Sequence, residues 1–480
     1  EAAAQCNLGL LYFQGICVEK NLKTAVIWYN KAAIQGNAHA QYSLGICYER
    51  GQGVEKDVKK AAYWYRQAAM QGEANAQYNL GLCYDKGRGV EKDVKKGAEW
   101  HEKAAIQGNA HAQNNLGRCY EEGDGVTQDK KKAVEWYRQA AMQGEAAAQC
   151  KLGILYCQGI GVEENLKTAV IWYNKAAMQG NAHAQYALGI CYEYGEGVEK
   201  DEKKAADWYM QAAMQGEAAA QCKLGFFYFQ GICVEKNPKK AVIWYNKAAM
   251  QGDALAQFNL GKCYFTGEGV TKDIKKAAEW YEKAANQGLA DAQCNLGNCY
   301  STGNGVPQDL KSAAEWYDKA AYQDNAVAQY NLGSCYINGK GVEKNLGTAV
   351  VWYNKAAMQG NARAQYNLAI FYKNGYGVPQ DEKKAAEWHE NAAKQGEASS
   401  QHNLAIYYET GTGVDKDEKK AVEWYEKAAN QGFANAQYNL GKCYERGDGV
   451  KKSLSKAGHW YEQAAKQGNE LAQAALIKLT

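Results

Sequence analysis

The sequence predicts an all-α protein, an α/α superhelical solenoid of helix–loop–helix repeats, and three observations lead to this prediction. Thirteen units of 36 residues follow one another from Ala2 to Asn469 without an insertion or a deletion. Small and apolar residues recur at helical spacing in two separate blocks of each unit. Most of the 50 glycines, against only three prolines, lie at fixed positions outside these blocks.

The first helix of each unit is expected to present one apolar face. Positions 3, 7, 10 and 11, which are Ala40, Leu44, Cys47 and Tyr48 in the second unit, have the spacing of one helical face. Position 14 is glycine in all thirteen units, as expected where a helix ends in the left-handed conformation. A loop of the form GxGV follows in most units, and its valine, Val54 in the second unit, provides an apolar anchor.

The second helix is expected to begin after position 20, which is Asn or Asp in twelve units and Ser453 in the last. The side-chain oxygens of these residues cap helix N-termini, an interaction that contributes about 1 kcal/mol. Positions 24, 27, 28 and 31, which are Ala61, Trp64, Tyr65 and Ala68 in the second unit, again lie on one helical face. Each unit is therefore predicted to be a helical hairpin.

A lone hairpin of 36 residues cannot bury enough surface to fold, so each repeat must be stabilised by its neighbours. The sequence therefore predicts a single solenoid domain over residues 1–480. This domain would contain thirteen repeats at 2–469 and a partial repeat or short capping helix at 470–480. The termini leave end-to-end association between copies of the chain open.

The pattern "AQYNLGLCY…GxGVEKD…KKAAEWYEKAANQG" resembles the Sel-like repeat (SLR) family, an α/α solenoid related to tetratricopeptide repeats. The resemblance covers essentially the whole chain. It implies a non-catalytic adaptor or scaffold that binds partner proteins or peptides on its concave surface, without a cofactor. An alternative is that the chain is the regulatory or targeting region of a larger enzyme, for example a kinase, whose catalytic domain lies outside this sequence.

The charge pattern argues against two classes of partner. The 56 basic and 53 acidic residues give a net charge of only +3, and they are scattered along the chain without a basic arm or an acidic tail. We therefore expect no nucleic-acid partner and no anionic membrane partner. No run of 18 apolar residues is present, so we expect no membrane span.

The 15 cysteines predict a reducing compartment. Eight of them occupy position 10 of their repeats, where other units have Leu, Phe or Tyr, so we expect free thiols in the core. Some secreted relatives carry paired cysteines that bridge the two helices of each repeat, and the cysteines here do not pair in that way. The expected location is the cytoplasm.

No catalytic or metal-binding constellation is expected. His39, His111 and His183 all occupy position 2, but two whole repeats separate successive histidines, too far for ligands that must lie about 2 Å from one ion. The glycine loops lack the spacing of phosphate-binding and calcium-binding loops. We therefore predict no catalytic, metal-binding or cofactor-binding residues.

The predicted binding surface lies on the first helices. Position 6 is asparagine in six consecutive full repeats, and position 5 is often aromatic in the same repeats. The amides could hydrogen-bond an extended peptide, although they could instead bridge adjacent helices; the aromatic side chains could anchor a partner or serve inter-repeat packing. The predicted partner-binding asparagines are Asn259, Asn295, Asn331, Asn367, Asn403 and Asn439, and the aromatic row is Phe258, Tyr330, Tyr366, His402 and Tyr438.

A basic clamp for a carboxyl terminus would need Lys or Arg at positions 2 and 6 of several repeats. Only three residues match either position, each in a different repeat: Arg363 at position 2, and Lys151 and Lys223 at position 6. Arg363 is included in the predicted surface because it lies within the asparagine-bearing repeats. A dedicated receptor for carboxyl termini is not expected.

Overall fold

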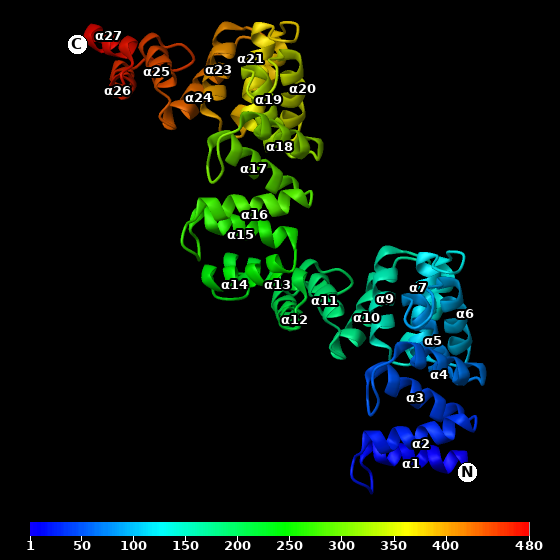
Figure 1. The fold of residues 1–480 in the computed structure, drawn as a ribbon. Helices are drawn as coiled ribbons and strands as arrows, with labels where there is room; N and C mark the ends of the chain where they lie inside the picture. Colours follow the sequence, from blue (N-terminus) through cyan, green and yellow to red (C-terminus); the bar gives the residue numbers. More distant parts are fainter. Residues whose placement is uncertain (480) are drawn as a thin grey trace. The chain divides into compact units, whose positions relative to one another are not determined.

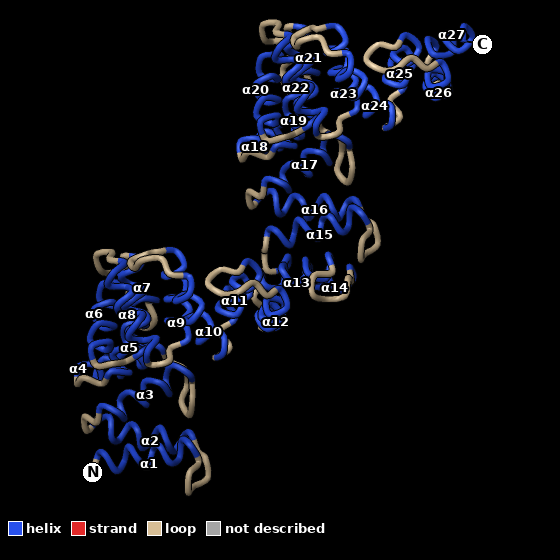
Figure 2. The backbone as a smooth tube through the Cα atoms, turned by 180° about the vertical axis from the view of Figure 1, so that it is seen from behind, coloured by secondary structure: helices blue, strands red, loops and turns tan. Residues whose placement is uncertain are grey.

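The computed structural model describes residues 1–479, and these residues form 27 α-helices and no strand (Figures 1 and 2). The predicted all-α solenoid of tandem helix–loop–helix repeats is confirmed. Contacts divide the chain into two compact units, Glu1–Asn237 and Pro238–Thr480, so a single domain over all repeats stays a prediction. The predicted final helix is present at Glu470–Leu479, and Thr480 lies outside the described residues.

The first unit contains the helices of repeats 1 to 6 and the first helix of repeat 7. Their bounds are α1 (Ala2–Gln14), α2 (Leu22–Ile34), α3 (Ala38–Arg50), α4 (Val58–Met70), α5 (Ala74–Lys86), α6 (Val94–Ile106), α7 (Ala110–Glu122), α8 (Lys130–Met142), α9 (Ala146–Gln158), α10 (Leu166–Met178), α11 (Ala182–Tyr194), α12 (Glu202–Met214) and α13 (Ala218–Gln230).

The second unit begins with the second helix of repeat 7 and continues through repeats 8 to 13 to the final helix. Its helices are α14 (Pro238–Met250), α15 (Ala254–Thr266), α16 (Ile274–Asn286), α17 (Ala290–Thr302), α18 (Leu310–Tyr322), α19 (Ala326–Asn338), α20 (Leu346–Met358), α21 (Ala362–Asn374), α22 (Glu382–Lys394), α23 (Ala398–Thr410), α24 (Glu418–Asn430), α25 (Ala434–Arg446), α26 (Leu454–Lys466) and α27 (Glu470–Leu479). None of the helices within residues 1–479 is both long and apolar enough to cross a membrane.

Helix ends lie where the sequence predicts them. In repeat 2, Asp57 is the N-cap of α4, and its carboxylate accepts hydrogen bonds from the backbone N–H groups of Lys59 and Lys60, each at 3.0 Å. Gly51 follows α3 with φ +71°, and its N–H donates to the carbonyl of Cys47. These two signals limit α3 and α4 to 13 residues each.

The core of each unit is a row of clusters, each formed between neighbouring helices in chain order. The first helix of a repeat packs on its second helix, which packs in turn on the first helix of the next repeat (Figure 1). In repeat 2 the tyrosine at position 28, Tyr65, is completely buried, whereas Trp64 beside it is only partly buried. A Cβ atom on Gly45 would lie 2.6 Å from the Tyr65 ring, so glycine at position 8 makes room for this tyrosine.

A ladder of glutamines, which the sequence analysis did not anticipate, connects the repeats. Gln41 at position 4 is buried and donates from Nε2 to the carbonyl of Ala33 in the preceding repeat, at 3.0 Å. Its Oε1 accepts from Nε2 of Gln71 at position 34, at 2.7 Å. The same pair of bonds recurs in repeat 11, where Gln365 bonds Ala357 and Gln395. The motifs AQ and QG, which occur in most repeats, therefore supply hydrogen bonds to the ends of buried helices.

Candidate functional site

The first-helix surface, formed by positions 5, 6, 9 and 12 of each repeat, contains all the predicted binding residues except Arg363, which is at position 2. The six predicted asparagines lie on α15, α17, α19, α21, α23 and α25, and all six are partly exposed. Four of them interact with the preceding repeat, namely Asn295, Asn331, Asn367 and Asn439. Burial raises the pKa of Tyr281 and Tyr353, the position-28 tyrosines of the repeats before them, and the amide donors of Asn295 and Asn367 beside the phenol oxygens partly offset this effect.

Part of the hydrogen-bonding capacity of the asparagines is used within the chain. Nδ2 of Asn331 donates to Oδ1 of Asn298 at 3.1 Å, and Nδ2 of Asn439 lies 3.1 Å from Nε2 of His402. These bonds cross from one repeat to the next, so the bridging role that the sequence left open is present at Asn331 and Asn439. Binding of a partner by the ladder stays a prediction.

The predicted aromatic row packs on the tyrosine or histidine at position 28 of the same repeat. The Phe258 and Tyr281 ring centroids are 5.9 Å apart, and Tyr330 is stacked on Tyr353 at 5.6 Å. Tyr366, His402 and Tyr438 lie 5.7–5.8 Å from His389, Tyr425 and Tyr461 in the same way. His402 is 9% exposed, and the other four are partly exposed. A bound partner can therefore contact the edges of these rings but not their whole faces.

The basic residues of this surface are used differently. Arg363 is exposed on α21. Nζ of Lys151 lies 3.4 Å from Glu121, and Nζ of Lys223 lies 3.0 Å from Glu193. Both position-6 lysines are thus ion-paired within the chain.

A pairing between positions 12 and 28 was missed by sequence reasoning. In repeat 2 the buried hydroxyl of Tyr65 donates to Oε2 of Glu49 at 2.6 Å, and the bond recurs with a glutamate in repeats 4, 6, 12 and 13. In repeat 3 the pair is His101 and Asp85, at 3.0 Å. The sequence signal was a carboxylate recurring 16 residues before the position-28 residue.

The carboxylate row is interrupted at repeats 1, 5 and 7 of the first unit, and over a longer stretch in the second unit. Position 12 is Phe265, Ser301, Ile337 and Lys373 in repeats 8 to 11, which cover residues 254–397, and a glutamate again in repeats 12 and 13. With Phe229 in repeat 7, position 12 therefore lacks a carboxylate over five consecutive repeats, 7 to 11, although the chain as a whole is nearly neutral.

Repeat 11 has histidine in place of the position-28 tyrosine. His389 is fully buried, its Nδ1 lies 3.4 Å from Oγ of Ser400, and its Nε2 has no hydrogen-bond partner within residues 1–479. Burial, with a smaller effect from the charge of Lys373, lowers the pKa of His389 to about 3. The folded protein therefore keeps this imidazole neutral at physiological pH.

Acidification should destabilise the fold through His389. Between pH 6.5, the ordinary pKa of histidine, and about pH 3, the unfolded chain binds a proton that the folded chain does not. The free energy of unfolding therefore falls with falling pH in this window, by up to about 1.4 kcal/mol per pH unit. Urea unfolding at pH 7 and pH 5 should show that the parent loses about 2 kcal/mol more than His389→Tyr, whereas equal losses would contradict the low pKa.

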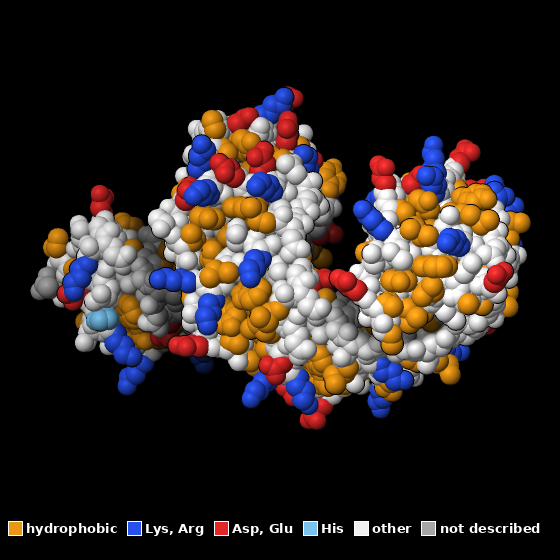
Figure 3. Space-filling model, turned by 60° about the horizontal axis from the view of Figure 1, so that its bottom comes forward, with side chains coloured by type: hydrophobic (Ala, Val, Ile, Leu, Met, Phe, Trp, Pro, Cys, Tyr) orange, Lys and Arg blue, Asp and Glu red, His pale blue; other side chains and the backbone are white. Residues whose placement is uncertain are grey.

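Charges elsewhere on the surface are mixed. Figure 3 shows Lys and Arg side chains scattered among Asp, Glu and apolar side chains, without a broad area of one sign on that face. This distribution is unlike the basic stripe that binds a nucleic-acid backbone. Within residues 1–479, no three His, Cys, Asp or Glu side chains are grouped as metal ligands would be.

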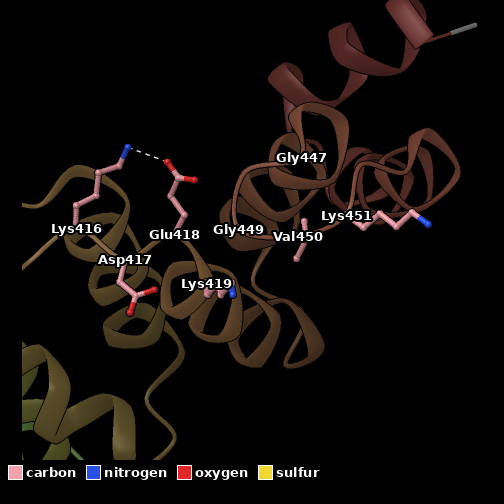
Figure 4. Close-up of a pocket in the computed structure, with 8 residues that line it drawn as sticks. All are labelled: Lys416, Asp417, Glu418, Lys419, Gly447, Gly449, Val450 and Lys451. Atoms are coloured by element: carbon pink, nitrogen blue, oxygen red, sulfur yellow. Dashed lines mark ion pairs between the residues drawn. The ribbon is translucent and has the colours of Figure 1, made fainter.

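A cavity of 730 Å³ between repeats 12 and 13 belongs to the packing of their loops (Figure 4). Lys416 and Glu418 on one side point toward each other and form an ion pair at 2.8 Å, while Lys451 on the other side points away. A Cβ on Gly449 would lie 2.1 Å from the carbonyl of Glu418. Because this close contact of a loop glycine with the preceding repeat recurs along the chain, we interpret the cavity as a structural seam.

Known proteins similar to this chain share its repeat. The Sel1 repeat model matches thirteen consecutive segments, from 2–37 to 434–469, with the bounds of the predicted units. The chain is 39% identical to a protective antigen of uropathogenic Escherichia coli strains that displays an SLR fold, covering 91% of this chain and 94% of that chain with a TM-score of 0.76. A Sel1 repeat protein from Oxalobacter formigenes is 35% identical, covering 64% of this chain and 88% of that chain with a TM-score of 0.49. None of the curated proteins matches this chain.

Proposed function

Because this chain belongs to the Sel1 repeat family, we propose that it is a non-catalytic scaffold that binds extended segments of partner proteins along its first-helix surface. Proteins built from this repeat are in general interaction scaffolds. The observation that carries the proposal is the row of partly exposed amides at one position of six consecutive repeats, Asn259 to Asn439. Side-chain amides at a regular spacing can donate to and accept from the backbone of an extended peptide.

The absence of a carboxylate at position 12 of repeats 8 to 11 supports partner binding on this part of the first-helix surface. Repeats 8 to 11, from 254 to 397, combine the amides with partly exposed aromatic edges and lack a glutamate or aspartate at position 12. Polar groups in these repeats are therefore less engaged with charges of their own chain. A partner segment would meet less competition here than on repeats whose position-28 tyrosines already bond a carboxylate.

A cytoplasmic location is part of the same proposal. All 15 cysteines are unbridged, and the eight at position 10 are buried in the core. Burial raises the pKa of Cys47 and Cys299 to about 11, so these thiols stay protonated and unreactive. A core of this composition suits a reducing compartment.

Affinity capture with a triple variant tests the proposed surface. Asn331→Ala, Asn367→Ala and Asn403→Ala together should weaken capture of partners from source-cell lysate at least about tenfold, because each lost amide removes a hydrogen bond at the interface. The matched control replaces Asn174, Asn246 and Asn354, which are exposed on second helices, by alanine. Equal capture by both variants, with unchanged helicity, would make the asparagine ladder structural.

A further inference from the structure

The geometry of repeat 8 points to a binding site for an acidic side chain, the carboxylate of a glutamate or aspartate in an extended partner segment. The site is a cavity of 370 Å³ between α15, α16 and α17, on the first-helix surface. This inference rests on the proposed function, because it names the chemistry that the surface would recognise at one position.

Most position-28 side chains find an acceptor or an ionic partner within their own repeat. Tyr65 donates to Glu49, and in repeats 9 and 10 the position-9 residues take the same role. Tyr317 donates to Oδ1 of Asn298 at 2.7 Å, and the hydroxyl of Tyr353 lies 3.0 Å from that of Ser334. These acceptors come from position 9 or position 12 of the first helix, although repeats 1, 5 and 7 have an apolar residue or a cysteine at both positions.

Repeat 8 replaces both of these acceptors. Position 9 is Lys262 and position 12 is Phe265, so neither can accept a hydrogen bond from Tyr281. The cavity opens at this place, and Tyr281, Lys262 and Phe265 all line it.

The remaining polar groups of the cavity favour a negatively charged guest. Oδ1 of Asn298 already accepts from Tyr317 and from Asn331, so its Nδ2 is the group left to donate. Asn298 and Asn295 line the cavity together with Tyr281. Amide and phenol donors beside an ammonium group match a carboxylate, which only accepts hydrogen bonds.

Unlike Lys151, Lys223 and Arg118, Lys262 has no ion partner within residues 1–479, a property that it shares with Lys442 at position 9 of repeat 13. Lys151, Lys223 and Arg118 lie 3.0–3.7 Å from a position-12 carboxylate of the preceding repeat. Nζ of Lys262 instead lies 5.7 Å from the ring of Phe258, and no carboxylate among the described residues pairs with it. A partner's carboxylate would supply the missing charge, and the Phe265 ring would contact the methylene groups of its stem.

Two variants at one position separate a filled site from an open one. Phe265→Glu places a carboxylate at position 12, as in repeats 2, 4 and 6, and should occupy Tyr281 and Lys262 from within the chain. Phe265→Leu keeps an apolar wall and leaves the site open. Both substitutions are at an exposed position of α15.

The probe is a random dodecapeptide library, displayed so that no peptide has a free carboxyl terminus and selected on the intact parent protein. The selected peptides should share a glutamate or aspartate, and replacing it by glutamine or asparagine should weaken binding to the parent at least about tenfold. Phe265→Glu should weaken binding by a similar factor, whereas Phe265→Leu should bind within about threefold of the parent.

The two levels of the proposal can fail separately. Peptides that bind the parent but are insensitive both to loss of their acid and to Phe265→Glu would overturn the acidic-side-chain site and leave the scaffold function in place. Failure to select any binding peptide would contradict the proposed function and this site with it. If Phe265→Glu does not fold, the comparison of acid and amide peptides on the parent still decides.

Discussion

Replacing Tyr65 by alanine is expected to lower the free energy of unfolding by about 3–5 kcal/mol. The side chain is completely buried against Gly45, and its ring centroid lies 6.1 Å from that of Tyr42. Its removal leaves a cavity between the two helices of repeat 2 and takes the hydrogen-bond donor away from Glu49. Urea unfolding followed by circular dichroism measures the loss, and hydrogen exchange should place it in repeats 1 to 3, because each repeat contacts only its neighbours.

Two neighbouring substitutions test the origin of this effect. Tyr65→Phe keeps the ring and removes only the bond to the carboxylate, so it should cost about 1.5–3 kcal/mol. Trp64→Ala removes a larger side chain that is only partly buried and should cost less than Tyr65→Ala. If Trp64→Ala were the more destabilising of the two, the core of the repeat would not be centred on the tyrosine.

The repeat and its helix limits could be predicted because each rests on local chemistry. Gly51 ends α3 through its own left-handed conformation, and Asp57 starts α4 through a bond two and three residues ahead. The relative burial of Trp64 and Tyr65 could not be predicted in this way. Adjacent residues on one helix differ in burial according to how the neighbouring helices approach, and that approach is set by Gly45 on another helix.

The residue types of the candidate site could be predicted from the sequence, but the hydrogen bonds between its residues could not. The asparagines and aromatic residues at positions 5 and 6 were recognised from their recurrence, whereas the bond from Tyr65 to Glu49 spans 16 residues and two helices. The cavity of repeat 8 was harder to foresee, because its signal is the loss of an acceptor. Phe265 and Lys262 acquire meaning only once the structure shows what their counterparts do in other repeats.

Replacing Gln365 by leucine should lower the free energy of unfolding by about 2–3 kcal/mol and weaken the coupling between repeats 10 and 11. Gln365 is buried, and its Nε2 donates to the carbonyl of Ala357 at 3.0 Å across the boundary of the two repeats. Leucine has nearly the same volume but cannot donate, so this carbonyl keeps only backbone donors such as the N–H of Gly360 at 3.0 Å, and the lost bond costs about 1–1.5 kcal/mol. It also removes the acceptor of Gln395, which bonds Gln365 at 2.7 Å.

Gln395→Leu is the matched control, because it removes the other half of the same glutamine pair. Gln395 is exposed, so water can replace it as the donor to Gln365, and its loss should cost about 1 kcal/mol or less. Urea unfolding should therefore separate the two variants, and hydrogen exchange in Gln365→Leu should increase on α20 and α21 before other helices. Equal costs would mean that the ladder acts through the exposed glutamine, and the bond to Ala357 would then contribute little to the contact between repeats.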